Sequence, residues 1–234
     1  MLYNADCYDI LKQMKSKSVD LVVIDPPYEI GKSDGGPCGL GGNKKYRSEL
    51  INLDICSGFD FKILDELCRV LKKINIYIWC NAAQIPKYFE YFKDKTNSFN
   101  IISWHKSNPI PTYMNHYLPD TEYCLFFRED GVHTYGNYNT LKTYYVSSIN
   151  KKDKDLYGHP TIKPLNIIEN LVINSSKENE VVLDCFMGSG TTGVACKKLN
   201  REFIGIEINK DYFNIAKKRI ESIDNNVALD DDVF

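Results

Sequence analysis

Short apolar runs rich in β-branched residues recur along this 234-residue chain and constrain its fold more than any other feature. Most are continuous rather than alternating, which is typical of strands covered on both faces of a sheet. They lie at residues 19–24, 74–79, 100–104, 122–127, 181–185 and 203–206. Helix-like stretches lie between several of them, at residues 7–14, 61–71, 165–173, 193–199 and 211–223. This alternation predicts an α/β fold on a doubly wound, mostly parallel sheet.

The length of the chain suits one domain with a substantial core, so we predict a single domain spanning residues 1–234. Two segments within it lack periodicity. Residues 29–58 hold seven glycines, and residues 130–158 are rich in Tyr, Asn, Thr and Lys. Loops this long inside a compact domain are usually functional or disordered. We therefore predict two inserted loops.

Composition excludes several classes of protein. No apolar stretch approaches the ~20 residues of a membrane span, and the N-terminus lacks the pattern of a secretory signal. The eight cysteines form no C-x-x-C pair, and several lie in apolar runs, where a free thiol packs as a small hydrophobic group. We predict a reduced, cytoplasmic protein with no structural metal and no membrane association. Because the net charge is −2, any basic surface for nucleic acid must be local.

The tetrapeptide Asp25-Pro26-Pro27-Tyr28 directly follows the first apolar run. Pro27 pushes Pro26 toward an extended backbone, and neither proline has an N–H group. The Pro26 carbonyl is therefore free to lie beside the Asp25 carboxylate as a second acceptor, with Tyr28 next to both. Two acceptors and a ring suit a planar base that carries an exocyclic amine. The alternative is a turn that ends a buried strand, with Tyr28 as ordinary core.

A glycine-rich motif near the C-terminus runs Phe186-Met187-Gly188-Ser189-Gly190-Thr191-Thr192-Gly193 after the apolar run at residues 181–185. This pattern predicts a strand, then a tight turn, then the start of a helix. In the turn, Gly188 and Gly190 let backbone N–H groups approach a ligand. Glu207 follows the next apolar run, where an acidic residue of a doubly wound sheet accepts hydrogen bonds from ribose hydroxyls. These glycines also match the dinucleotide fingerprint, so an NAD-linked oxidoreductase is an alternative.

Two observations favour S-adenosylmethionine over NAD as the ligand of this loop. S-adenosylmethionine has no pyrophosphate, so its loop needs only close backbone approach, and Phe186 precedes the glycines as it does in methyltransferases. In addition, only about one strand and one helix can follow the loop before Phe234. The remaining strands must come from the N-terminal half, so the strand before Asp25 precedes the cofactor strand. That order is foreign to dehydrogenases.

In this order the two motifs resemble those of the amino-methyltransferases that act on DNA, specifically the permuted (β) class. The resemblance covers most of the chain. It implies a Rossmann-like methyltransferase sheet of seven strands, one of them antiparallel, in circularly permuted motif order. It also implies S-adenosylmethionine as methyl donor and a base flipped out of double-stranded DNA as substrate.

The resemblance also implies roles for individual residues. Asp25 and the Pro26 carbonyl each accept one N–H bond from the target amine, Pro27 completes the motif, and Tyr28 stacks on the base. Residues 4–7 resemble the segment near the adenine of the cofactor, and residues 159–164 resemble the lead-in to a helix beside it, with Thr161 or Lys163 at the methionine end. The alternative for residues 159–164 is a capped helix start. The predicted cofactor-binding residues are Asp6, Cys7, Lys163, Asp184, Phe186, Gly188, Ser189, Gly190, Thr191, Thr192 and Glu207.

The substrate is predicted from the same resemblance. Asp at the first motif position favours adenine N6, because cytosine-N4 enzymes more often have Ser there. It favours DNA because relatives that act on RNA or glutamine more often have Asn. Residues 29–58 and 130–158 are the segments left to read base edges in a groove. The predicted DNA contacts are Lys32, Lys44, Lys45, Arg47, Asn137 and Asn139.

This recognition material is small for the family. A short target site, a homodimer or a partner protein would each compensate, and a cognate restriction endonuclease stays open as a partner. Other hypotheses for the function of the chain also stay open: a cytosine-N4 or RNA methyltransferase, and a DNA-binding regulator that has kept the fold but lost catalysis. The intact Asp25, Tyr28 and loop glycines argue against the regulator.

Overall fold

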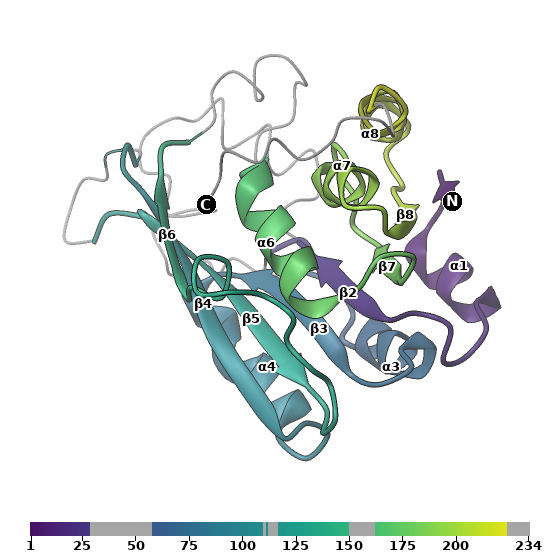
Figure 1. The fold of residues 1–234 in the computed structure, drawn as a ribbon, viewed down its shortest axis with the longest axis horizontal. Coiled ribbons are helices and arrows are strands. Elements are labelled where there is room, and N and C mark those ends of the chain that lie inside the picture. Colours follow the sequence, from purple (N-terminus) through teal and green to yellow (C-terminus); the bar gives the residue numbers. More distant parts are fainter. Residues whose placement is uncertain (29–57, 110, 112–116, 150–161, 224–234) are drawn as a thin grey trace.

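The structure, a computed structural model, describes residues 1–28, 58–109, 111, 117–149 and 162–223. A single mixed sheet of eight strands organises this part of the chain. The strand order is β1-β8-β7-β2-β3-β5-β4-β6 (Figure 1). The strands are β1 Leu2–Tyr3, β2 Leu21–Ile24, β3 Asn75–Cys80, β4 Ser98–Lys106, β5 Thr121–Arg128, β6 Tyr144–Ser147, β7 Val181–Asp184 and β8 Glu202–Ile206. Within these residues only β5 runs antiparallel to its neighbours. The predicted α/β fold on a mostly parallel sheet is confirmed.

Two details of the sequence prediction were wrong. The described sheet has eight strands where seven were expected, and neither β1 nor β6 lies in one of the apolar runs. Strand β6 also falls within residues 130–158, which were predicted as a loop. It pairs with β4 at the sheet edge and keeps one side of its side chains exposed, so its sequence carries no long apolar run.

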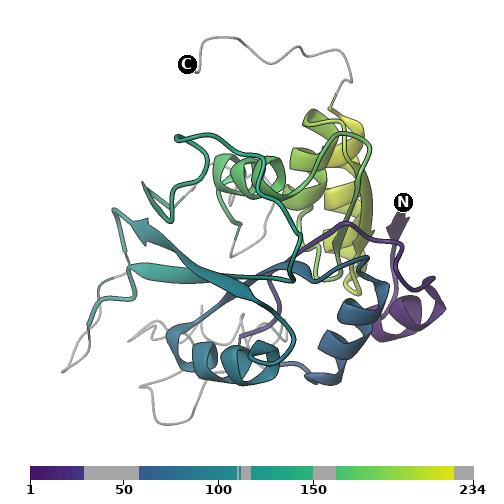
Figure 2. The same cartoon turned by 60° about the horizontal axis from the view of Figure 1, so that its bottom comes forward.

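Helices cover both faces of the sheet (Figure 2). On one face lie α1 Cys7–Gln13, α3 Lys62–Val70 and α4 Ile85–Phe92, and on the other lie α6 Leu165–Ser175, α7 Thr191–Lys198 and α8 Lys210–Glu221. Five of these six helices were predicted, and α4 was missed. No helix in the described ranges is long and apolar enough to cross a membrane.

This double cover explains the continuous apolar runs. In β2, Val22 and Ile24 pack into the core beneath α1, α3 and α4. Leu21 and Val23 point the other way, into the core beneath α6 and α7. Since successive side chains of a strand face opposite sides, a strand that is buried on both must be apolar at every position.

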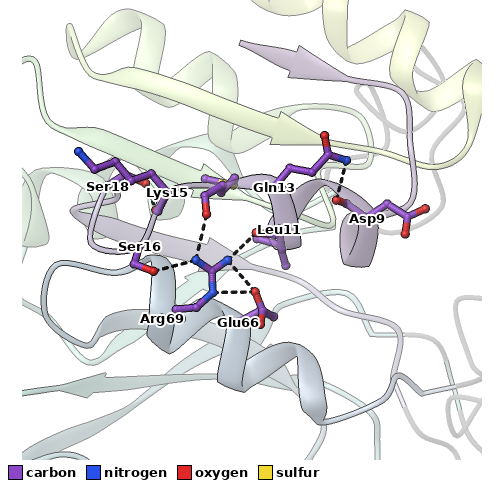
Figure 3. A network of polar contacts seen from close by, with 9 residues as sticks. Asp9, Leu11, Gln13, Lys15, Ser16, Ser18, Glu66 and Arg69 are labelled. Carbon is purple, nitrogen blue, oxygen red and sulfur yellow. Dashed lines mark hydrogen bonds and ion pairs between the residues drawn. The ribbon is translucent and has the colours of Figure 1, made fainter.

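Arg69 of α3 fixes the position of α1. Figure 3 shows its guanidinium at the end of α1, where it donates to the carbonyls of Leu11 (2.7 Å) and Met14 (2.9 Å). The same group pairs with Glu66, 2.7 Å away. The last carbonyls of a helix have no partner within the helix, so these bonds satisfy them and hold α1 against α3.

The chain leaves the two central strands in opposite directions. Strand β7 leads through α7 to β8 on one side, and β2 leads through α3 to β3 on the other. In open α/β sheets, ligands bind in the crevice at the carboxyl ends of strands where the order reverses in this way. A ligand site is therefore expected at the carboxyl ends of β2 and β7.

Candidate functional site

Acidic residues from both predicted motifs meet at this edge of the sheet. Asp25 follows β2, Asp184 ends β7, Glu207 follows β8, and Asp6 lies just after β1. Because these strands are parallel neighbours, their carboxyl ends share one edge. Asp184 interacts electrostatically with both Asp25 and Glu207. The structure thus brings together two motifs that are far apart in the sequence.

The two carboxylate oxygens of Asp25 have different surroundings. Oδ2 accepts a hydrogen bond from Nζ of Lys163 at 2.5 Å. Oδ1 is buried and has no donor within hydrogen-bonding distance among the described residues, although the nearby Tyr28 hydroxyl interacts with this carboxylate. Burial raises the pKa of Asp25, and the Lys163 ammonium opposes that rise. Oδ1 is therefore a buried acceptor that is available to a ligand.

Glu122, at the start of β5, is a member of this site that the sequence analysis did not identify. It lies 3.1 Å from Nζ of Lys163 and 2.5 Å from Nζ of Lys106, and the Tyr28 hydroxyl donates to it at 3.4 Å. Although burial opposes its ionisation, Lys163 and Lys106 lower its pKa to about 2. It is therefore a fixed negative charge beside the Asp-Pro-Pro-Tyr turn.

The glycine loop is closed by bonds within the protein. Gly188 and Gly190 have positive φ angles of 52° and 84°, which favour glycine. The N–H of Gly188 donates to Glu207 Oε2 at 2.8 Å, and the N–H of Gly190 donates to the carbonyl of Met187 at 2.9 Å. The first bond ties the loop to the end of β8, where Glu207 was predicted to meet the cofactor ribose, and the second closes the turn.

Polar side chains of the loop also have partners in the protein. Thr192 donates to Asp184 Oδ2 at 2.7 Å. Arg219 of α8 donates to the carbonyl of Ser189 at 2.8 Å and to the hydroxyl of Thr191 at 3.4 Å. These contacts shape the loop, and direct contact of Ser189, Thr191 and Thr192 with the cofactor stays a prediction.

The remaining predicted cofactor residues lie around the loop. Asp6 caps α1, because its Oδ1 accepts from the N–H of Tyr8 at 2.8 Å. Cys7 is buried in the core beneath α1. The ring of Phe186 is half-buried and lies 5.7 Å from the ring of Phe59. The loop and the start of α1 are thus both at the carboxyl edge.

The charge of this edge suits a cation better than a pyrophosphate. Burial raises the pKa of Asp184 to about 7 and also raises the pKa of Glu207, so added negative charge is unfavourable here. The Glu207 carboxylate already accepts from the N–H of Gly188, a glycine that would have to approach a dinucleotide pyrophosphate. The sulfonium and ammonium groups of S-adenosylmethionine fit this surrounding, and the residues present suit that cofactor.

Asp184 gives a testable dependence of stability on pH. Its pKa is about 7 in the folded chain against 3.8 for a free side chain, so stability falls as the pH rises between these values. Asp184→Asn removes this charge and can keep the bonds to Phe186 and Thr192. We expect the variant to exceed the wild type in free energy of unfolding by a few kcal/mol at pH 8, at about 1.4 kcal/mol per pKa unit, and by little at pH 4.

Urea unfolding of both proteins at the two pH values measures this difference. Asp94→Asn, at an exposed position, is the matched control and should unfold like the wild type at each pH. A gap between Asp184→Asn and the wild type that does not widen with pH would contradict the assignment.

The predicted DNA contacts are not brought to this edge within the described residues. Asn137 and Asn139 are exposed in a turn, where Asn137 Oδ1 accepts from the N–H of Asn139 at 2.9 Å. That turn is tied to Asn174, at the end of α6 remote from Lys163, by a bond to the carbonyl of Thr140. The other predicted DNA contacts, and Thr161, lie outside the described residues: Lys32, Lys44, Lys45 and Arg47.

Comparison with known proteins places this site in context. A family model described as DNA methylase matches residues 19–218. The type II methyltransferase M2.LlaDCHI of Lactococcus lactis subsp. cremoris is 34% identical, over 94% of this chain and 88% of the relative. M2.DpnII of Streptococcus pneumoniae, also a type II methyltransferase, is 32% identical over 95% and 90%. The crystal structure of an M1.HpyAVI-SAM complex, 28% identical, superposes with a TM-score of 0.67 and covers 94% of this chain and 98% of that one.

Proposed function

The chain belongs to the DNA methylase family, and we propose that it transfers the methyl group of S-adenosylmethionine to the N6 amine of adenine in double-stranded DNA. One observation carries the choice of acceptor site. The buried Oδ1 of Asp25, without a donor among the described residues, lies at the end of β2, next to the strand that leads into the glycine loop. A buried acceptor of this kind suits the N–H group of an incoming amine.

The target base must leave the duplex to reach this acceptor, and we propose that it is flipped out of the stack. Asp25 Oδ1 and the Pro26 carbonyl then each accept one N–H bond from the amine, and the ring of Tyr28 stacks on the base. Contacts of this stacking kind contribute about 1–3 kcal/mol per base in other proteins. These contacts orient the nitrogen lone pair and hold the reacting atoms together.

Asp25 also handles the charge that develops during transfer. The cofactor supplies a methyl group on a positively charged sulfur. As the bond from nitrogen to the methyl carbon forms and the carbon–sulfur bond breaks, positive charge moves to the amine nitrogen. The Asp25 carboxylate stabilises that charge and then takes one N–H proton, which leaves a neutral N-methylated amine on the base. Burial raises the pKa of Asp25 and so makes it a better proton acceptor than a free aspartate.

The cofactor proposal rests on the loop and its charges. Gly188 and Gly190 allow close backbone approach, and we propose that Glu207 binds the ribose hydroxyls and that Asp6 lies near the adenine. The relative M1.HpyAVI, of similar fold over nearly the whole chain, is described as a complex with SAM, which supports this choice. We also propose the permuted motif order, because β2 with Asp25 precedes β7 with the glycine loop in the chain.

Adenine N6 is proposed over cytosine N4 because Asp25 leads the motif. We further propose a single domain and a cytoplasmic location, in keeping with a DNA substrate and with six free cysteines among the described residues. A homodimer and a cognate endonuclease stay predictions.

The test is transfer of labelled methyl from S-adenosylmethionine to unmethylated duplex DNA of mixed sequence, followed by nucleoside analysis. We expect N6-methyl-deoxyadenosine. N4-methyl-deoxycytidine would keep the mechanism and overturn the choice of base, and label in RNA alone would overturn the choice of polymer. Binding of DNA without any transfer would favour the inactive regulator.

A further inference from the structure

Four charged side chains form a chain of contacts beside Asp-Pro-Pro-Tyr, and the proposed reaction assigns a role to only one end of it. Asp25 contacts Lys163, Lys163 contacts Glu122, and Glu122 contacts Lys106, at 2.5, 3.1 and 2.5 Å. Positive and negative groups alternate, so the cluster has no net charge. Buried charges are tolerated when they are paired in this way.

The register of the sheet brings these residues together. Lys106 ends β4 and Glu122 lies near the start of β5, which runs antiparallel to β4. Strand β5 is also antiparallel to β3, which lies beside β2, so both residues reach the edge that carries Asp25. Lys163 arrives from the other face, just before α6.

Lys163 is enclosed and fixed as a cation. Its side chain is 6% exposed, and its Nζ lies 5.1 Å from the ring of Trp79 and 5.6 Å from the ring of Tyr28. Burial alone would lower the pKa of this lysine, but Asp25 and Glu122 together raise it. The ammonium therefore acts as a permanent link between two carboxylates.

Lys163 makes the two oxygens of Asp25 unequal. It occupies Oδ2, while Oδ1 is buried and has no donor among the described residues. A buried acceptor left without a donor is unfavourable, and the ion pair at Oδ2 opposes the rotation of the carboxylate that would relieve it. The carboxylate is thus held with one oxygen presented to a ligand.

We propose that Lys163 and Glu122 are positioning residues for methyl transfer: Lys163 holds Asp25 by Oδ2 so that Oδ1 meets the target amine, and Glu122 anchors Lys163. This inference rests on the proposed function and adds two residues to it. It also gives Lys163 a task at the amine-binding carboxylate, in place of its predicted contact with the methionine end of the cofactor.

The proposal predicts that two charge-neutralising variants shift the pKa of Asp25 in opposite directions. Lys163→Met removes the cation that favours ionised Asp25, so the pKa of Asp25 should rise. Glu122→Gln removes an anion that raises the pKa of Asp25 and leaves Lys163 to Asp25 alone, so this pKa should fall. Other groups that interact with Asp25 stay in place in both variants: Tyr28 in its own turn, Cys80 at the end of β3, Cys124 on β5 and Asp184 on β7.

The first measurement needs no activity. In protein labelled with ¹³C at aspartate carboxyls, the Asp25 signal, assigned by its loss in Asp25→Asn, is followed against pH in the wild type and both variants. The second measurement is the pH profile of kcat, whose acid limb should move to higher pH in Lys163→Met and to lower pH in Glu122→Gln. We expect kcat of Lys163→Met to fall by about 10²-fold, with KM for DNA and Kd for S-adenosylmethionine nearly unchanged.

Matched variants separate positioning from general damage. Lys198 forms an ion pair with Glu169, 2.6 Å long, that lies away from the site. Lys198→Met breaks this pair and should leave kcat and its pH profile as in the wild type. Lys163→Arg keeps the charge and should restore the acid limb even where its rate is lower. Circular dichroism and thermal unfolding confirm which variants are folded.

The outcomes distinguish this proposal from the proposed function. Loss of cofactor affinity in Lys163→Met, with the Asp25 titration unchanged, would show that Lys163 serves the cofactor alone and overturn the positioning role. The positioning role would also be overturned if both variants were active and the acid limbs of their kcat profiles lay at the same pH. A wild type that transfers no methyl group to any nucleic acid would instead contradict the proposed function, and the positioning role with it.

Discussion

Replacing Asp25 with alanine is expected to abolish methyl transfer while leaving cofactor binding largely intact. The substitution removes the buried oxygen that has no donor among the described residues, and with it the carboxylate that orients the amine and accepts its proton. Losses of positioning and of a proton acceptor together predict a fall in kcat of about 10³-fold or more. Glu207 and the glycine loop are untouched, so affinity for S-adenosylmethionine should change little.

The measurement is single-turnover transfer of labelled methyl to duplex DNA, with calorimetry for cofactor affinity. Asp25→Ala leaves Lys163 paired with Glu122 but without its closer partner, and breaking a buried ion pair costs about 3–5 kcal/mol, so folding must be checked. Asp25→Asn keeps the shape and serves as a second variant. Asp94→Ala, at an exposed position, is the matched control and should keep full activity. Retained turnover in a folded Asp25→Ala would remove Asp25 from the mechanism.

The central strands were predictable because burial on both faces leaves a local mark. Every residue of β2 and β3 is buried, and such runs stand out in any window of the sequence. Helix α4 was missed although its start signals are present: Asn81 and Gln84 form a capping box before it, and Pro86 lies in its first turn. Its aromatic residues, which favour strands, obscured that signal.

The residues of the candidate site likewise fall into those that a local sequence pattern predicts and those that only the fold brings together. Asp25 and the glycine loop were found because each is a contiguous motif at a strand end. Glu122 and Lys106 are ordinary charged residues at the ends of strands, and they are linked to Asp25 through Lys163, which lies 138 positions after Asp25 in the chain. Strand register and the packing of α6 bring them together, and neither can be read from a window of sequence.

Gly190→Ala is expected to weaken cofactor binding strongly and to destabilise the fold. Gly190 has φ = +84°, and a left-handed backbone costs a residue with a Cβ about 1–2 kcal/mol. The added Cβ would also lie 2.8 Å from Cβ and 3.0 Å from Cα of Ala216, so the loop or α8 must shift. A shifted loop loses the close approach that the cofactor requires. We expect Kd for S-adenosylmethionine to rise at least tenfold, or about 1.4 kcal/mol.

Gly131→Ala is a matched control for this variant. Gly131 has a similar φ of +77°, but its Cβ would meet Nζ of Lys73 at 2.6 Å, which is the far end of a flexible side chain and not part of a packed backbone. It therefore carries the backbone strain without a clash against a packed helix. Calorimetry with S-adenosylmethionine and thermal unfolding of both variants separate the two effects. Gly131→Ala should lose some stability and keep its cofactor affinity, and equal behaviour of the two variants would mean that contact with α8 does not hold the loop in its binding conformation.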